Sequence, residues 1–383
     1  MTYTLEQIFL YPEDDLNKIL LQVGDKNDYE SINRKRSAIV NYLGSYISQN
    51  EYTRNPNFQI ALLYSSSYNQ LKFILDNQFM IDLLNNKITG LNLWNNNLGP
   101  EGAQFFAEAL KVNTSLTTLD FWGNNLDPQG AKFLAEALKV NTSLTTLDLT
   151  SNDLGSQGAQ YLAEALKINK SLTNLDLRYN YLGPQGGQFL SEALKVNTSL
   201  TNLGLWNNNL GSQGAQFLAE ALKVNTSLTT LDLEFNNLGP QGARFLAEAL
   251  KVNTSLTNFN LSGNDLDPQG GQFLAEALKV NASLTSLNLT SNNLSLREGQ
   301  SLSEALSVNT SLVNLDLQYN DLSPQRIYEI NIKLNKNKHY KEVILPQLKI
   351  ERLNLYLSLI YIKISDDIID ELITFHKQIN YSE

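Results

Sequence analysis

The sequence predicts an α/β solenoid, a right-handed βα coil with a parallel concave sheet, convex helices and helical caps at both ends. Three observations lead to this prediction. A unit of 28 residues returns through most of the 383-residue chain, and its first apolar place moves in equal steps from Ile88 to Leu312. Each unit begins with the period-two apolar pattern of a strand. It continues with helix start and stop signals, and stacking of such units is the usual meaning of a repeat this long.

The strand of each unit follows the pattern L-x-x-L-x-L-x-x-N-x-L, with leucine at places one, four and six in the unit that starts at Leu144. Apolar residues at the fourth and sixth places predict a short strand with one buried face. A stacked amide at the ninth place can pair backbone groups at the turn that leaves the strand, so we interpret this column as scaffold. All nine units carry asparagine there: Asn96, Asn124, Asn152, Asn180, Asn208, Asn236, Asn264, Asn292 and Asn320.

The helix of each unit has recognisable ends. The twelfth place is always Gly, Asp or Ser, which are competent N-cap residues, and proline often follows, as at Pro128. Apolar or small residues then recur at helical spacing, as at Ala131, Leu134 and Leu138. The helix is predicted to end near Asn141 and its equivalents, because asparagine tolerates the left-handed conformation of a C-terminal cap.

The units occupy residues 86–337, and the flanks break the period. A solenoid leaves an apolar cross-section at each end, so 1–85 is interpreted as an N-terminal helical cap, with an independent binding module as the alternative. Residues 338–383 are interpreted as a C-terminal helical cap. We expect one extra strand at 343–345, stopped by Pro346, and then two helices that shield the last unit, 353–364 and 368–375.

The composition narrows the function. A net charge of −10, from 39 acids and 29 bases, disfavours nucleic acid and acidic membranes as partners. The absence of cysteine excludes disulfides and thiolate chemistry and fits a reducing compartment. The N-terminus lacks a secretory pattern, and no run approaches the roughly 18 apolar residues of a membrane span. A cytoplasmic location is therefore predicted.

No catalytic machinery is predicted. The chain shows no phosphate-binding glycine loop and no cluster of metal ligands, and His339 and His376 both lie outside the repeats. Carboxylates on the concave face would stand in an open, wet channel, where nothing raises a pKa for acid catalysis. We expect no enzyme activity, no cofactor and no metal.

The nine units resemble the ribonuclease-inhibitor type of leucine-rich repeat. The strand pattern followed by L-G-x-x-G-A-x-x-L-A-E-A-L-K-x-N carries this resemblance over residues 86–337. Similar repeats occur in sensor regions of Nod-like receptors, in Ran GTPase-activating proteins and in effectors of intracellular bacteria. The resemblance implies a horseshoe that binds a protein, because such relatives share a scaffold and differ in partner.

Two finer functions follow from that resemblance. The enrichment of Asn, Ile and Lys in the flanks suggests an AT-rich genome and favours a bacterial effector that acts in the cytosol of a host cell. The alternative is a GTPase-activating scaffold, although the long acidic tail of the Ran-directed family is missing. The sequence leaves the oligomeric state open, and we expect a monomer.

The candidate binding face comprises the third, fifth and seventh places of each strand, which point into the concavity, with the eighth place at the rim. The seventh place varies widely: Trp94, Trp122, Thr150, Arg178, Trp206, Glu234, Ser262, Thr290 and Gln318. The eighth place adds Tyr179, Phe235 and Tyr319, and the tenth adds Tyr181. Aromatic residues and arginine dominate binding energy at protein interfaces. The alternative is that exposed rings are ordinary, or pack along the sheet against their neighbours.

Acidic side chains line the same strands. The fifth place contributes Asp120, Asp148, Asp176, Asp232 and Asp316, and the tenth contributes Asp153, Asp265 and Asp321. With Glu234 there are nine acids against the single base Arg178, so we predict a negative face and a partner with a basic surface. The alternative is that the aspartates are solvated or paired with neighbouring threonines. Carboxylates about 4.8 Å apart in a column do not form a compact calcium cage.

Overall fold

The structure, a computed structural model, describes residues 86–355. In this range strands and helices alternate in the order β1 (Gly90–Asn92), α7 (Gly99–Val112), β2 (Thr118–Asp120), α8 (Asp127–Leu138), β3 (Thr146–Asp148), α9 (Gly155–Leu166), β4 (Asn174–Asp176), α10 (Gly183–Leu194), β5 (Asn202–Gly204), α11 (Gly211–Leu222), β6 (Thr230–Asp232), α12 (Gly239–Leu250), β7 (Asn258–Asn260), α13 (Asp267–Leu278), β8 (Ser286–Asn288), α14 (Leu296–Ala305), β9 (Asn314–Asp316), α15 (Pro324–His339) and the π-helical turn η2 (Tyr340–Ile344). The predicted N-terminal cap, residues 356–364 of the predicted helix at 353–364 and the helix predicted at 368–375 lie outside these residues.

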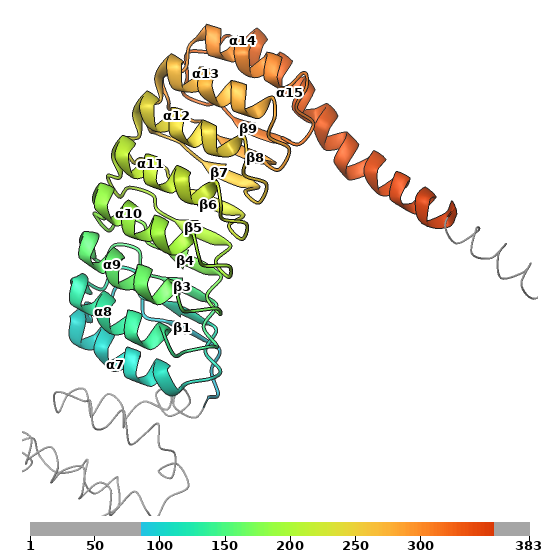
Figure 1. Cartoon of the computed structure of the whole chain (residues 1–383). Coiled ribbons are helices and arrows are strands. Elements are labelled where there is room, and N and C mark those ends of the chain that lie inside the picture. Colours follow the sequence, from blue (N-terminus) through green and yellow to red (C-terminus); the bar gives the residue numbers. More distant parts are fainter. Residues whose placement is uncertain (1–85, 356–383) are drawn as a thin grey trace, which may run out of the picture.

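The described strands form one parallel sheet in chain order, β1 to β9. Each residue pairs with the one 28 positions further on, as Leu91 does with Leu119. In Figure 1 the strands stack along the inner side of a gentle curve and the helices cover the outer side. At about 4.8 Å per strand, nine strands give a face roughly 40 Å long. The predicted βα solenoid is therefore confirmed.

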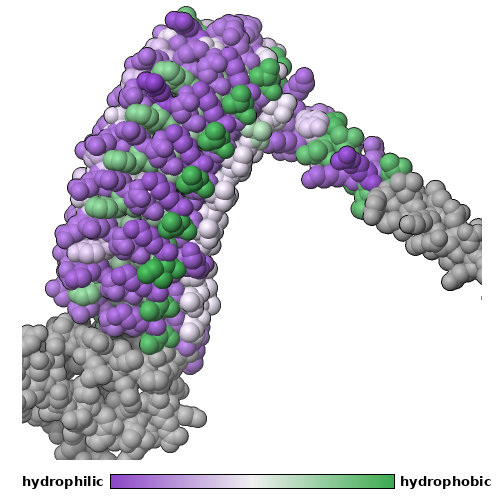
Figure 2. All heavy atoms as spheres, viewed as in Figure 1, coloured by the Kyte–Doolittle hydropathy of each residue, from purple (hydrophilic) through white to green (hydrophobic). Residues whose placement is uncertain are grey.

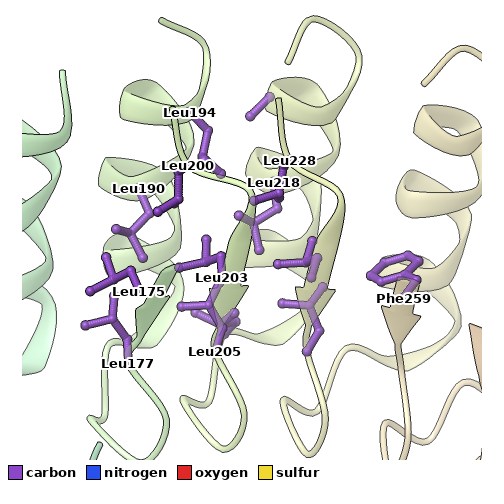
Figure 3. Packing of buried hydrophobic residues seen from close by; sticks show 14 of the residues in the cluster. Leu175, Leu177, Leu190, Leu194, Leu200, Leu203, Leu205, Leu218, Leu228 and Phe259 are labelled. Atoms are coloured by element: carbon purple, nitrogen blue, oxygen red, sulfur yellow. The ribbon is translucent and has the colours of Figure 1, made fainter. Parts of the chain in front are cut away.

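The core lies between the sheet and the helices and runs without interruption along the solenoid. Leu203 and Leu205 of one strand segment are 2% and 0% exposed, and they meet buried helix leucines such as Leu190 and Leu218. Figure 3 shows leucines from neighbouring units interdigitating in this layer. Each buried leucine contributes about 1.5–3 kcal/mol. Because its contacts reach into adjacent units, a single unit has no stable core of its own.

The helix starts explain why the twelfth place holds Gly, Asp or Ser. Gly183 has φ +63°, a left-handed conformation that glycine adopts without a steric penalty. Asp127 has φ +56° and its Oδ1 accepts hydrogen bonds from the backbone N–H groups of Gln129 and Gly130 at 2.5 and 3.3 Å. Ser295 forms a capping box with Glu298. The N-cap prediction holds for these side chains, and glycine acts through its backbone.

The asparagines at the helix ends differ from the prediction of a left-handed cap. Asn113 is extended, with φ −74° and ψ 133°. The equivalent Asn141 is buried, and its Nδ2 donates to the Leu110 and Asn113 carbonyls at 2.8 and 3.0 Å, while its Oδ1 accepts from the Leu144 amide at 2.8 Å. The side chain therefore joins two units and closes the return loop. It forms a second ladder, parallel to that of the ninth place.

The C-terminal end shows one further correction. Helix α15 covers the last repeat with Ile330 and Leu334, which are 1% and 5% exposed. The strand predicted at 343–345 is wrong, because η2 and the helix after it continue α15 with no turn that would return the chain to the sheet. A run of three apolar residues does not distinguish strand from helix. Residues 347–355 are exposed, and in Figure 1 their helix leaves the solenoid instead of shielding it.

Candidate protein-binding face

The sheet face, defined as the side chains at the third, fifth and seventh places with the eighth at its rim, is the accessible side of the strands. Leu119 at a fourth place is 1% exposed because it points to the helices. Trp94 and Trp122 at seventh places are 52% and 43% exposed. The strand alternation predicted from the sequence thus puts these two indoles on the open face, away from the helices.

Five aromatic side chains of the sheet face form two clusters. Trp94 and Trp122 stack with their ring centroids 5.2 Å apart and their planes at 24°. Trp206 contacts Tyr179 at 4.8 Å and Phe235 at 6.4 Å between centroids. Strand β3, which carries no ring on this face, separates the clusters. The alternative that exposed rings pack along the sheet against their neighbours is therefore correct in part, since most of these rings do contact a neighbouring ring.

The indole of Trp206 has a polar group in an unusual state. Its Nε1–H is buried and has no hydrogen-bond acceptor among the described residues. Trp206 itself is half-buried between Tyr179 and Phe235. An unpaired buried donor normally costs about 1–3 kcal/mol. The arrangement of Trp206, Tyr179 and Phe235 is thus not the one that stability alone would favour.

The backbone of the rim is left-handed, a feature that was not predicted from the sequence. Every eighth place has φ between +48° and +68°, and most copies carry Asn, Gly or Ser there. Tyr179, Phe235 and Tyr319 adopt the same conformation, as does Tyr181 at the tenth place. Bulky residues rarely adopt it, at a cost on the order of 1 kcal/mol or more. The Asn, Gly and Ser of most eighth places and the Asn and Asp of most tenth places were the signal that could have revealed it.

A glycine in the next unit accommodates one of these rings. A Cβ built on Gly263 would lie 2.3 Å from the Phe235 ring, so the ring occupies the space that any other residue would fill. Gly263 holds the eighth place one strand along from Phe235. The aromatic side chain and the small neighbour therefore depend on each other.

The fifth-place aspartates hold the end of each strand. Asp120 accepts a hydrogen bond from the Trp122 amide at 2.9 Å, and Asp232 accepts one from the Glu234 amide at 3.0 Å. Asparagine does the same elsewhere, since Asn260 accepts from the Ser262 amide at 3.1 Å. The turn needs an oxygen acceptor and not a charge. The negative charges of this column are therefore not explained by the fold.

The electrostatics of the sheet face are unbalanced. Burial raises the pKa of Asp148, and the neighbouring carboxylates of Asp176 and Asp120 raise it further. Burial also raises the pKa of Asp232, with a contribution from Glu234. Carboxylates with raised pKa values favour a nearby cation.

The single base of the described strands does not balance these acids. The Nε of Arg178 donates to Oδ1 of Asp176 at 2.8 Å, and its terminal nitrogen lies 2.6 Å from Oδ2. Glu234 is held by the side-chain amide of Asn260 at 2.9 Å and lies near the Ser262 hydroxyl at 3.4 Å. Arg178 is therefore paired with Asp176 within its own strand segment.

The tenth-place acids lie apart from the strand acids. Asp153 and Asp265 are exposed in the left-handed turn beyond the strand, and Asp265 accepts a hydrogen bond from the Asn293 amide group at 3.0 Å. Asp321 follows β9 in the equivalent turn, and Asp316 is exposed on β9 itself. The structure thus groups Asp120, Asp148, Asp176 and Asp232 near the rings and leaves these four acids at the edges.

The helical side offers less to a partner. Lysine and glutamate side chains pair along each helix, as Lys139 does with Glu136 at 2.6 Å. Phe133 and its helix equivalents pack against the core. Within residues 86–355 no group of three or more His, Asp or Glu side chains is placed to hold a metal ion. No helix in that range is long and apolar enough to cross a membrane.

The repeated strand, asparagine turn and helix define a class, the βα solenoids with a parallel inner sheet. Within that class, the family model described as "Leucine Rich repeat" matches seven stretches: residues 84–107, 112–135, 140–163, 169–191, 224–247, 252–275 and 280–297. These stretches of the chain are therefore leucine-rich repeats. The unit of β5 and α11 lies between matched stretches and has the same strand, turn and helix as its neighbours.

Solved structures show limited similarity to this chain, and no curated protein matches it. Leiomodin-1 actin-binding site 2 is 26% identical, with a TM-score of 0.33, over 38% of this chain and 90% of that one. The leucine-rich-repeat protein LegL7 from Legionella pneumophila is 21% identical, with a TM-score of 0.42, over 73% and 95%. The tropomodulin C-terminal domain of Caenorhabditis elegans is 14% identical, with a TM-score of 0.30, over 57% and 98%.

Proposed function

We propose that this protein is a scaffold that captures another protein, one with a basic surface, on its sheet face. The observation that carries the proposal is the combination at the rim and the fifth place. Aromatic rings occupy strained left-handed positions, next to carboxylates whose charge the turns do not need. In other units a smaller residue holds the same position without this strain. An aromatic residue that lowers stability there is therefore retained for a reason other than folding.

The two kinds of side chain would divide the work of binding. Apolar groups of the partner would pack on the Trp94–Trp122 pair and on the cluster around Trp206, where each well-packed anchor is worth about 2 kcal/mol or more. Lysine or arginine side chains would pair with Asp148 and Asp232. Such a cation would lower the raised pKa of both carboxylates, so binding should weaken as pH falls through those values.

The test is an affinity capture with the full chain as bait, with bound proteins identified by mass spectrometry. We expect Trp94→Ala with Trp122→Ala to abolish capture of a specific basic protein, and Trp206→Ala to weaken it. Tyr328→Ala is the control, because Tyr328 is a 62% exposed aromatic residue on α15, away from the sheet face. Circular dichroism melts check that each variant is folded.

Two results would refute the proposed face. The tryptophan variants could capture the same protein as well as the wild type, or the Tyr328 control could lose it equally. Salt is a further check, because an interface between acids and a basic surface weakens as ionic strength rises. Capture that is unchanged between low and high salt would contradict the basic partner.

We also propose that the protein acts in a cytoplasm, and as a bacterial effector in that of a host cell. The cysteine-free composition and the enrichment of Asn, Ile and Lys in the flanks support this proposal. A reporter fused to the chain and expressed in the source organism during infection tests delivery. The GTPase-activating alternative predicts faster GTP hydrolysis when the chain is added to a small GTPase, whereas a simple binder leaves the rate unchanged.

A further inference from the structure

A second surface of the solenoid carries an unexplained apolar stripe. The residue before the helix-end asparagine is valine or isoleucine in eight consecutive units, and it is 54–63% exposed in the seven from Val140 to Val308. The stripe consists of Val140, Ile168, Val196, Val224, Val252, Val280 and Val308. Figure 2 shows a continuous line of hydrophobic side chains along one edge of the solenoid. This edge is distinct from the sheet face.

The fold does not account for these side chains. The backbone N–H of Val196 donates to the Ala193 carbonyl at 3.1 Å, a bond that any residue except proline can make. The side chain itself remains more than half exposed. An exposed apolar stripe of this length exceeds the scattered apolar residues of an ordinary surface, and extended patches of this kind mark interaction sites.

The surroundings of the stripe carry little net charge. The preceding lysine in six of the units pairs with a glutamate three residues earlier, as Lys195 does with Glu192 at 2.6 Å. Two residues beyond the stripe the chain exposes mainly threonine, as at Thr198, with Lys170 and Ala282 as the exceptions. The chain as a whole has a charge of −10, yet this edge is close to neutral. A second copy would therefore meet little repulsion there.

We propose that this edge is the contact surface between two copies of the chain, which lie antiparallel about a two-fold axis. The stripe has a constant period, and a second copy has the same period, so every valine meets an equivalent residue. In a two-fold contact the central residue of a patch faces itself. Val224 is the fourth of the seven, and it therefore lies on the axis, while Val140 faces Val308.

The edge offers as many residues as a specific dimer uses. Three rows in seven units, namely the stripe, the residue before it and the residue two places after it, comprise 21 residues per copy. Standard protein interfaces use about 20–30 residues a side. The dimer keeps both sheet faces open. Two linked sheet faces would raise the avidity for a partner with more than one copy of its epitope. This replaces the expectation of a monomer.

The test measures the mass of the full chain in solution by sedimentation and light scattering. We expect a dimer at micromolar concentration. Val196→Asp combined with Val224→Asp should raise its dissociation constant roughly a hundredfold, because like charges then meet across the axis. Gln188→Asp with Gln216→Asp is the matched control. It adds the same charges at exposed positions of α10 and α11, away from the stripe, and should not change the mass.

Cross-linking tests the register independently. The chain has no cysteine, so a single introduced thiol is unique. Val224→Cys should form a disulfide-linked dimer under mild oxidation, because the two Cα atoms must come within about 7 Å. Val140→Cys alone should stay monomeric in a denaturing gel, but mixed with Val308→Cys it should cross-link.

The proposal is overturned by any of three results. The wild type could be a monomer up to roughly 100 µM. The stripe variant could associate as tightly as the wild type. Val224→Cys could fail to cross-link in a chain that is a dimer. None of these results bears on the sheet face, because the capture experiment uses different variants.

Discussion

Replacing Asn208 by alanine tests whether the asparagine ladder holds the solenoid together. Asn208 is fully buried. Its Nδ2 donates to the Leu177 carbonyl of the preceding unit and to the Leu205 carbonyl of its own, both at 2.9 Å. Its Oδ1 accepts from the Asn180 amide at 3.0 Å. Alanine leaves the backbone N–H groups of Asn180 and Leu182 without an acceptor. The two carbonyls keep hydrogen bonds from the side-chain amides of Asn180 and Asn236.

The expected magnitude follows from that count. A buried polar group left unpaired costs about 1–3 kcal/mol, so two groups give roughly 2–6 kcal/mol. We expect a value near the lower limit, about 2 kcal/mol, because the neighbouring turn residues Asn207 and Asn209 are exposed and water can approach.

Urea unfolding of the full chain measures the loss, and hydrogen exchange at the Asn180 amide should accelerate in parallel. Gln216→Ala is the control. Gln216 is exposed on α11, and its replacement should change the free energy of unfolding by less than about 0.5 kcal/mol. A loss of under about 1 kcal/mol for Asn208→Ala, or unchanged exchange at Asn180, would refute the structural role assigned to the ladder.

Two further predictions concern the sheet face. Tyr181→Asn should stabilise the protein by about 1 kcal/mol, because Tyr181 is 72% exposed at φ +53° and asparagine is better suited to that conformation. Asn209→Tyr, at the same place of the next unit, should destabilise the protein by a similar amount. Thermal melts measure both effects, and equal melting temperatures for the two variants would contradict the backbone strain assigned to tyrosine at this place. Asp148→Asn should stabilise the protein at pH 7, because the folded pKa of Asp148 is raised and asparagine can still accept from the Thr150 amide. The gain should vanish as the pH falls through that pKa, because the wild-type carboxyl is then protonated and uncharged, like asparagine. Denaturation at neutral and acidic pH measures it. The same difference in unfolding free energy between variant and wild type at both pH values would contradict this role of the charge.

Much of the architecture follows from the sequence because the repeat converts local patterns into columns. Leu147 and Leu149 alternate with polar residues, so they define one buried face. The strict step of 28 residues places each such pair beside the next, and the observed register agrees. The role of the ninth-place asparagines is also evident from the sequence, since a polar residue that recurs beside buried leucines in every unit must find hydrogen-bond partners there.

Strand alternation and the 28-residue step also identified the candidate binding residues, but they did not predict the contacts that these residues make. Trp94 and Trp122 stand on the open face, because strand alternation alone decides on which side a residue lies. The separation of the rings into two clusters depends on side-chain rotamers and on Gly263, one strand away from Phe235. The prediction at 343–345 failed because three apolar residues satisfy a helix as well as a strand.

Tertiary structure alone decided three matters. The left-handed backbone at Tyr179 and Phe235 arises because the chain must turn from strand to helix around the buried ladder, and a bulky aromatic residue gives no sign of that conformation. The internal pairing of Arg178 with Asp176 depends on where two flexible side chains come to rest. The exposure of Val224 and its equivalents depends on where the helix ends relative to its neighbours, whereas valine in a repeat otherwise suggests core. The repeated pattern therefore predicts the scaffold from the sequence, whereas the exposed surfaces depend on contacts between units.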